Sequence, residues 1–279
     1  MKKKSKTWEK ILQERTNRYT KSTSLRNRYQ VDFRKRGVVK GKLLYDRVCK
    51  CLGGVIPKEF LEVGCGIGDI CIWFAKQGVD TLGIDIVQEV VDIGNMRKKE
   101  ESLNNLNFMH LDISKSTAPR KYSFIMCVDV LEHIKNDADA VKNMALSLRE
   151  GGHIYLSVPN KFSLFYIFSD PHYHVPFVAL MRQKWANVIV SKLLRKHTGV
   201  DVQKLYSRSD IKHLCYSVGY NIQVKETNKD QFEENVLTRT THLRRALKLF
   251  CRSKLVKRIF CYVYLSFYVK NHVLLLSVE

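Results

Sequence analysis

Short apolar runs alternate with helical stretches between residues 38 and 158, and this alternation constrains the fold more than any other feature. The apolar runs, which indicate buried strands, lie at 60–63, 81–85, 106–112, 122–128 and 153–158. The stretches with helical spacing lie at 38–52, 69–76, 88–101 and 137–148. Glycine pairs follow two of these stretches, and we expect Gly53-Gly54 and Gly151-Gly152 to end their helices. The alternation predicts βαβ units in a mainly parallel sheet, where ligands bind beyond the carboxyl ends of the strands.

A glycine-rich loop, Gly64-Cys65-Gly66-Ile67-Gly68, follows the first of these strands and precedes a helix. Glycine lets the backbone turn sharply there and lets a ligand approach closely. The spacing differs from the dinucleotide fingerprint, and the Gly-Lys-Ser/Thr end of a phosphate-binding loop is missing. Asp85 ends the next strand, where a carboxylate suits ribose hydroxyls, and Asp112 ends the third, where it suits an adenine amino group.

Four segments, taken in order, resemble class I S-adenosylmethionine-dependent methyltransferases. They are Glu62-Val63-Gly64-Cys65-Gly66-Ile67-Gly68, Gly83-Ile84-Asp85-Ile86, Leu111-Asp112-Ile113 and Asp129-Val130-Leu131-Glu132-His133. The resemblance covers about residues 40–225 and the final strand. It implies an α/β, Rossmann-like fold with a seven-stranded, mostly parallel sheet, an antiparallel last strand and helices on both faces. Residues 220–224 and 273–278 fit the closing hairpin of such a sheet.

The resemblance also implies S-adenosyl-L-methionine as the cofactor and assigns residues to it. The glycine loop would pass under the methionine part, and Asp129 would lie beside the amino-acid end. Asp85 would hold the ribose, and Ile86 would lie against the adenine. Glu62 would lie near the loop or, alternatively, would cap backbone amides as a strand-end carboxylate. The full set of implied cofactor-binding residues is Glu62, Gly64, Cys65, Gly66, Gly68, Asp85, Ile86, Asp112, Ile113, Asp129 and Val130.

The segment after the fourth strand resembles the ubiquinone-biosynthesis O-methyltransferases and the small-molecule group around them. Methyl transfer to an alcohol or phenol needs a base, and His133 is the candidate. A structural histidine that caps the following segment is the alternative for His133. His172 and His174, in the segment after the fifth strand, are alternative bases.

A divalent metal is an open alternative at the same segment. Some relatives with a Glu-x-x-Glu-His pattern bind a metal, and here Asp129, Glu132 and His133 occupy that pattern. His172 and His174 could complete such a site. Asp129 has a shorter side chain than the glutamate at the first position of that pattern. The Asp-x-x-Glu-His pattern also occurs in relatives without metal.

The formal net charge of +21 is concentrated at the two ends of the chain. Residues 1–50 carry a net +13, residues 51–181 a net −4 and residues 182–279 a net +12. Residues 242–260 alternate basic and apolar side chains at helical spacing, as interfacial membrane helices do. The alternative is an insertion packed on the sheet with a solvated basic face. We expect an N-terminal basic arm at 1–37 and a methyltransferase domain at 38–279. Within that domain we expect a lid at 160–205 and a basic amphipathic insertion at 230–270.

Composition limits the classes of protein that remain. A hydrophobic fraction of 45% excludes a wholly disordered chain, and the longest apolar run, 259–269, is too short to cross a bilayer. The cysteines form no Cys-x-x-Cys pair, which argues against a zinc site. Cys65, Cys71 and Cys127 lie within apolar segments, as buried thiols do, and this pattern fits a reduced, cytoplasmic chain. We therefore expect O-methylation of a small-molecule or lipid-linked acceptor, glycan or quinone-like, in the cytoplasm, with peripheral binding to an anionic inner membrane face. An RNA 2′-O-methyltransferase and a non-catalytic cofactor-binding protein are the alternatives; the oligomeric state is not predicted.

Overall fold

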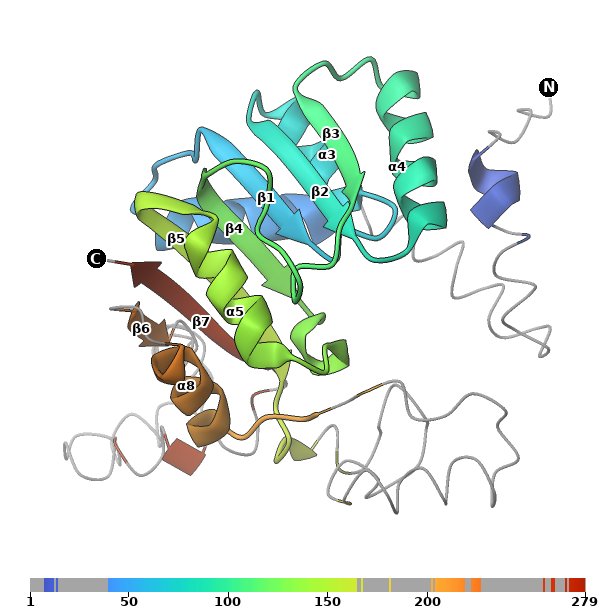
Figure 1. Cartoon of the computed structure of the whole chain (residues 1–279). Helices are drawn as coiled ribbons and strands as arrows, with labels where there is room; N and C mark the ends of the chain where they lie inside the picture. The colour runs from blue at the N-terminus through green and yellow to red at the C-terminus, as the bar shows by residue number, and fades with distance from the viewer. Residues whose placement is uncertain are drawn as a thin grey trace, which may run out of the picture. The chain divides into compact units, whose positions relative to one another are not determined.

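The computed structural model describes the central part of the chain and several shorter pieces (Figure 1). The described residues are 8–12, 14, 40–164, 167, 181, 202, 204–218, 222–226, 258, 262–263, 269 and 271–278. The expected arm at 1–37, lid at 160–205 and insertion at 230–270 therefore lie largely outside the described residues. His172 and His174 lie outside them entirely.

Seven strands of the described residues form one sheet in the order β3-β2-β1-β4-β5-β7-β6. Their bounds are β1 Glu59–Val63, β2 Asp80–Asp85, β3 Leu106–His110, β4 Tyr122–Val128, β5 Leu148–Pro159, β6 Ile222–Glu226 and β7 Asn271–Val278. Strands β1, β2 and β3 pair in parallel, whereas β7 is antiparallel to both β5 and β6. The expectation of an α/β fold with a mostly parallel sheet and an antiparallel last strand is confirmed.

The contacts within the chain divide it into two compact units, and the first comprises Met1–Asp112 and Arg120–Met126. It contains a helix over 40–51, α3 at Asp69–Lys76 and α4 at Gln88–Glu100. The 40–51 helix buries Leu44 and Val48, whereas Leu43 is exposed, so its apolar spacing marks the buried face only in part. The rings of Phe60 and Phe74 stack with centroids 3.9 Å apart in the core of this unit.

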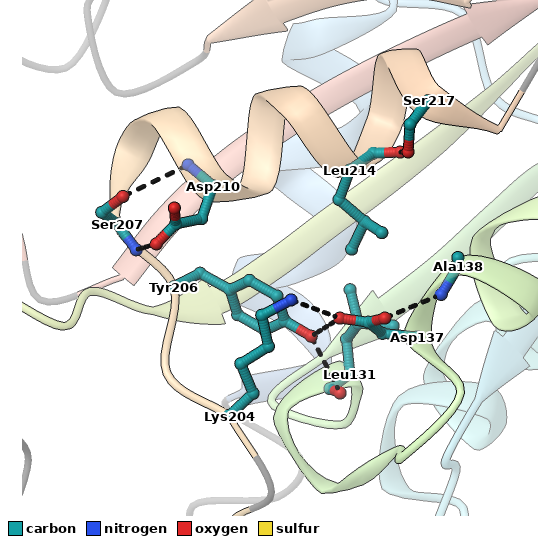
Figure 2. Close-up of polar contacts among 9 residues, drawn as sticks. All are labelled: Leu131, Asp137, Ala138, Lys204, Tyr206, Ser207, Asp210, Leu214 and Ser217. Atoms are coloured by element: carbon teal, nitrogen blue, oxygen red, sulfur yellow. Dashed lines mark hydrogen bonds and ion pairs between the residues drawn. The ribbon is translucent and has the colours of Figure 1, made fainter. Parts of the chain in front are cut away.

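The second unit comprises Ile113–Pro119 and Cys127–Glu279. Its elements are β5, β6 and β7, a 3-10 turn η1 at Leu131–His133, α5 at Asp137–Leu146 and α8 at Arg208–Ser217. A capping box starts α8: the Ser207 side chain accepts from the Asp210 amide, and the Asp210 carboxylate accepts from the Ser207 amide (Figure 2). This cap sets the N-terminal end of α8.

One predicted helix end is wrong. The Gly151-Gly152 pair was expected to end the helix over 137–148, but α5 ends at Leu146 and β5 already begins at Leu148. Both glycines lie inside β5, and Gly151 has a positive φ of 68°. The backbone of Ser147 instead closes the helix, because its amide donates to the carbonyls of Asn143 and Met144.

Within the described residues, no helix is long and apolar enough to cross a bilayer.

Candidate cofactor-binding and catalytic site

The glycine loop is fastened to the end of β2 by backbone and side-chain hydrogen bonds. The amides of Gly64 and Cys65 both donate to the carbonyl of Ile84, at 2.8 and 3.0 Å. The amide of Gly66 donates to Asp85 Oδ2 at 2.9 Å, and the other carboxylate oxygen accepts from the amide of Val87, also at 2.9 Å. Asp85 therefore orders the loop as well as the strand end, and each oxygen keeps a lone pair for a further donor.

The middle and last glycines of the loop, Gly66 and Gly68, are needed for different reasons. Gly66 has φ +53°, and nothing lies within 4 Å of where its Cβ would be. That open space beside a backbone turn leaves room for a ligand to approach closely. Gly68 has φ +81°, and a Cβ there would come within 2.3 Å of the Phe108 ring. The ring of Phe108 thus packs directly against the backbone of the loop at Gly68.

Glu62 is almost fully buried, and its partner is the start of α3. Its Oε2 accepts from the amide of Cys71 at 3.1 Å and from the Cys71 thiol at 2.9 Å. Burial raises the pKa of Glu62 to about 8. These contacts match the capping role that the sequence left as the alternative for Glu62. Sequence reasoning missed Cys71 as the partner of Glu62, because its only signal was its place in the first turn of the helix.

The residues assigned to the adenine differ in their exposure. Ile86 is 62% exposed, which is high for an isoleucine that follows a buried strand. Its carbonyl is 2.9 Å from Nε2 of His110. Asp112 is half-buried. Ile113 is buried, and its carbonyl accepts from the side-chain amide of Asn143 at 2.8 Å.

Asp129, directly after β4, has a backbone conformation that non-glycine residues rarely adopt, with φ +57°. Its amide donates to the carbonyl of Ser157 at 3.0 Å, and its Oδ1 accepts from the side-chain amide of Asn271. Asn271 also donates to Ser157 Oγ at 3.2 Å. A strained residue held from several sides is typical of functional sites. Asn271 was missed because nothing in the local sequence around it indicates that β7 returns to this loop.

The next turn, η1, carries Glu132 and His133. Glu132 is completely buried, its carboxylate oxygens have no hydrogen-bond partner among the described residues, and burial raises its pKa to about 8. The His133 side chain is 31% exposed, with Nε2 4.0 Å from Glu132 Oε1. Across the described part of the chain, no three His, Cys, Asp or Glu side chains gather as metal ligands. The hypothesis of a metal at Asp129, Glu132 and His133 therefore gains no support from their positions.

A buried tyrosine holds this turn in place (Figure 2). The hydroxyl of Tyr206 donates to Asp137 Oδ2 at 2.8 Å and lies 3.5 Å from the carbonyl of Leu131. Lys204 reaches the same Asp137 oxygen at 3.0 Å, and its amide donates to the carbonyl of Glu132 at 3.2 Å. Burial and the adjacent Asp137 raise the pKa of Tyr206. The 204–206 segment thereby fixes the turn that presents His133.

Comparison with known proteins identifies the family. A model described as "Methyltransferase domain" matches residues 42–224, well over half of the chain. The chain belongs to the methyltransferase domain family. The class I S-adenosylmethionine-dependent family expected from the four sequence segments is confirmed.

Curated relatives of this methyltransferase domain include ubiquinone biosynthesis O-methyltransferases. The protein from Acinetobacter baumannii is 29% identical over 119 residues, which are 42% of this chain and 50% of the relative. The protein from Serratia proteamaculans is 29% identical over 110 residues, 39% of this chain and 46% of the relative. The match thus spans about half the length of these relatives.

Solved structures share the fold of the methyltransferase domain at low sequence identity. An S-adenosylmethionine-dependent methyltransferase from Clostridium acetobutylicum aligns over 92% of this chain and all of its own, with a TM-score of 0.55 and 12% identity. PKMT2 from Rickettsia typhi, solved in complex with AdoHcy, aligns over 79% of this chain and 48% of its own. Its TM-score is 0.51 and its identity 16%. At these identities the likeness concerns the fold.

Proposed function

We propose that this protein is an S-adenosylmethionine-dependent methyltransferase that methylates an oxygen of a small-molecule acceptor. The hydrogen bond between the Gly66 amide and Asp85 carries the proposal, because it places a carboxylate and an open backbone turn side by side at the end of β2. The family match supports the cofactor class, and the O-methyltransferases among the curated relatives support oxygen as the acceptor atom.

The residues of the loop fit such a cofactor. Gly66 leaves space where any side chain would stand, and Asp85 keeps acceptor capacity for ribose hydroxyls. Ile86, exposed in the structure, offers an apolar surface for an adenine ring. Asp112 and Ile113 would bracket that ring, and Asp129 would receive the amino-acid end. Glu62 would act indirectly, because its Oε2 is already bound by the amide and thiol of Cys71.

The chemistry assigned to this chain is positioning and proton removal. The bound cofactor would supply a methyl group on a sulfonium, which an acceptor oxygen attacks in line. His133 is the proposed base, because its partly exposed imidazole can reach an acceptor hydroxyl and hold the proton. The fixed turn beneath it, with Tyr206 bound to Asp137, would keep the imidazole in place.

A lipid-linked acceptor at an anionic membrane face is the finer form of the proposal. It rests on the sequence alone, on the basic and apolar alternation of residues 242–260. The matching experiment is flotation with liposomes containing anionic lipid, with and without residues 242–268. Equal flotation of the two chains would remove the membrane from the proposal. Methyl transfer to RNA with salt-dependent binding would favour the RNA alternative instead.

Calorimetric titration with S-adenosylhomocysteine tests the cofactor part. We expect the wild-type chain to bind, and Asp85→Ala to lose binding because both the ribose acceptor and the anchor of Gly66 are removed. Asp92→Ala, which removes an exposed carboxylate from α4, is the control and should bind as the wild type does. Radiolabelled methyl transfer to a panel of phenolic and alcoholic acceptors then identifies the substrate. No binding by the wild-type chain would overturn the proposed function.

A further inference from the structure

Trp8 is buried although it lies in the basic N-terminal region. Residues 8–12 and 14 are helical, and only 6% of the Trp8 surface is exposed. Its indole Nε1 donates to Glu100 Oε2 at 2.9 Å, at the end of α4. The guanidinium of Arg97 lies over its ring, 4.8 Å from the centroid. One aromatic side chain therefore anchors this segment to the last turn of α4.

Arg97 connects that anchor to the glycine loop. Its Nη1 donates to the carbonyl of Ile67 at 2.6 Å, and its Nη2 is 2.8 Å from Asp69 Oδ1. Ile67 stands between Gly66 and Gly68, and Asp69 is the first residue of α3. The side chains of Arg97 and Asp69 are only 11% and 13% exposed. A planar guanidinium in a fork of this kind fixes both position and direction, which a lysine does not.

The Trp8 ring should strengthen these contacts. Covering a charged hydrogen-bonding group with an apolar surface keeps water away from it, and electrostatic interactions strengthen as the local dielectric falls. The ring face also attracts the guanidinium directly. Removal of Trp8 exposes Arg97 to water and frees its side chain to leave the Ile67 carbonyl.

We propose that Trp8, acting through Arg97, is a positioning residue that holds the glycine loop in its cofactor-binding form. This inference rests on the proposed cofactor. Cofactor affinity then depends on a segment that lies outside the residues matched by the methyltransferase family, which begin at 42. The dependence is reciprocal, because a docked segment that favours the cofactor must itself be favoured by the cofactor to the same extent.

The affinity of the full chain for S-adenosylhomocysteine, measured by calorimetry, is the first readout. Trp8→Ala is expected to weaken binding about tenfold, which corresponds to the loss of one well-shielded cation–π contact. Arg97→Lys should weaken it as well, because the fork to Ile67 and Asp69 is lost. Trp8→Phe, which keeps a ring, should lie between wild type and Trp8→Ala. Lys10→Ala removes an exposed charge from the same helix and serves as the matched control.

Hydrogen exchange at the amides of residues 8–12 is the second readout. Saturating S-adenosylhomocysteine should slow their exchange in the wild-type chain and should have less effect in Arg97→Lys. A purely stabilising role for Trp8 would lower the melting temperature of Trp8→Phe and leave its affinity and exchange response unchanged, which overturns the inference. A wild-type chain that does not bind overturns the proposed function as well. Binding by the wild type with equal affinity in all Trp8 and Arg97 variants overturns this inference alone.

Discussion

The ring of Phe108 occupies the place that a side chain at Gly94 would need: a Cβ there would come within 2.9 Å of Phe108 Cγ. Gly83 and Gly68 approach the same ring, with Cβ positions within 2.8 and 2.3 Å of it. The glycine loop, β2 and α4 therefore close on one aromatic side chain of β3. Their close packing against this ring requires glycine at all three positions, because a Cβ at any of them would clash with it.

Gly94→Ala is expected to lower the free energy of unfolding by about 1–3 kcal/mol, because the added methyl overpacks against Phe108. At a solvent-exposed position of a helix, the change from glycine to alanine would instead stabilise by up to about 1 kcal/mol. The sign of the change in the free energy of unfolding therefore tests the contact. Urea denaturation gives the value. The double variant Gly94→Ala with Phe108→Leu should lose less stability than the sum of the losses of the two single variants, because the smaller side chain makes room for the methyl. Losses that simply add would contradict direct contact between the two positions.

Gly66→Ala and Gly78→Ala form a matched pair. Both glycines have positive φ and open space around them, so each alanine should cost about 1–2 kcal/mol of stability for the backbone alone. Gly78 lies just beyond α3, away from the loop, so only Gly66→Ala should weaken S-adenosylhomocysteine binding. Calorimetry on both variants measures the difference. Equal affinities would exclude a close approach of the cofactor to Gly66.

His133→Ala is expected to keep cofactor affinity and to lose turnover, because the proposed base is removed while the loop and Asp85 are untouched. His213→Ala, an exposed histidine on α8, is the control and should retain turnover. The methyl-transfer assay measures both once an acceptor is known. Full activity in His133→Ala would remove this residue as the base.

Glu62 predicts a pH dependence of stability. Burial raises its pKa from 4.5 to about 8, so between these values the folded chain holds a proton that the unfolded chain has lost. The free energy of unfolding therefore falls as pH rises through this window, by up to about 1.4 kcal/mol per pH unit from this group. Glu62→Gln should remove that contribution and make the profile measured by denaturation at pH 5 to 8 shallower, while Glu132, whose pKa burial also raises to about 8, keeps a slope in the same direction. The exposed Asp92→Asn should leave the profile as it is in the wild type.

Tyr206→Phe tests the support of the η1 turn. Loss of the buried hydroxyl leaves Lys204 as the remaining side-chain donor to Asp137 Oδ2. We expect the free energy of unfolding to fall by about 1–3 kcal/mol. Lys204→Ala, which removes a half-exposed ion pair, should cost about 1 kcal/mol or less. Thermal denaturation compares the two. A larger loss for Lys204→Ala would show that the ion pair, not the tyrosine, holds the turn.

Local patterns were enough for the elements nearest the loop. The helix at 69–76 and the strand at 122–128 have the predicted bounds, because each is delimited by its own apolar spacing and flanking residues. The end of α5 was not predictable in this way. Glycine pairs usually stop helices, but β5 begins at Leu148 and runs through Gly151, ahead of its pairing with β7, which starts at His153.

The contacts that shape the site depend on the fold and leave no local signal. Arg97 and Ile67 are 30 positions apart, and Asn271 and Asp129 are 142 apart. Neither pair follows from spacing or composition, because only the folded chain brings α4 to the glycine loop and β7 to the end of β4. The sequence located the glycine loop and Asp85, whereas the residues that hold them became visible only in the structure.

The position of β7 also sets the order of events during synthesis. It is the last described strand to leave the ribosome, yet it lies between β5 and β6 and delivers Asn271 to Asp129. At about 5–20 residues per second, roughly 7–30 s separate the translation of these two residues. For the part of that interval that follows its own synthesis, β5 presents an unpaired edge that can capture another chain. Nascent chains halted before residue 271 should therefore depend on chaperones and aggregate without them.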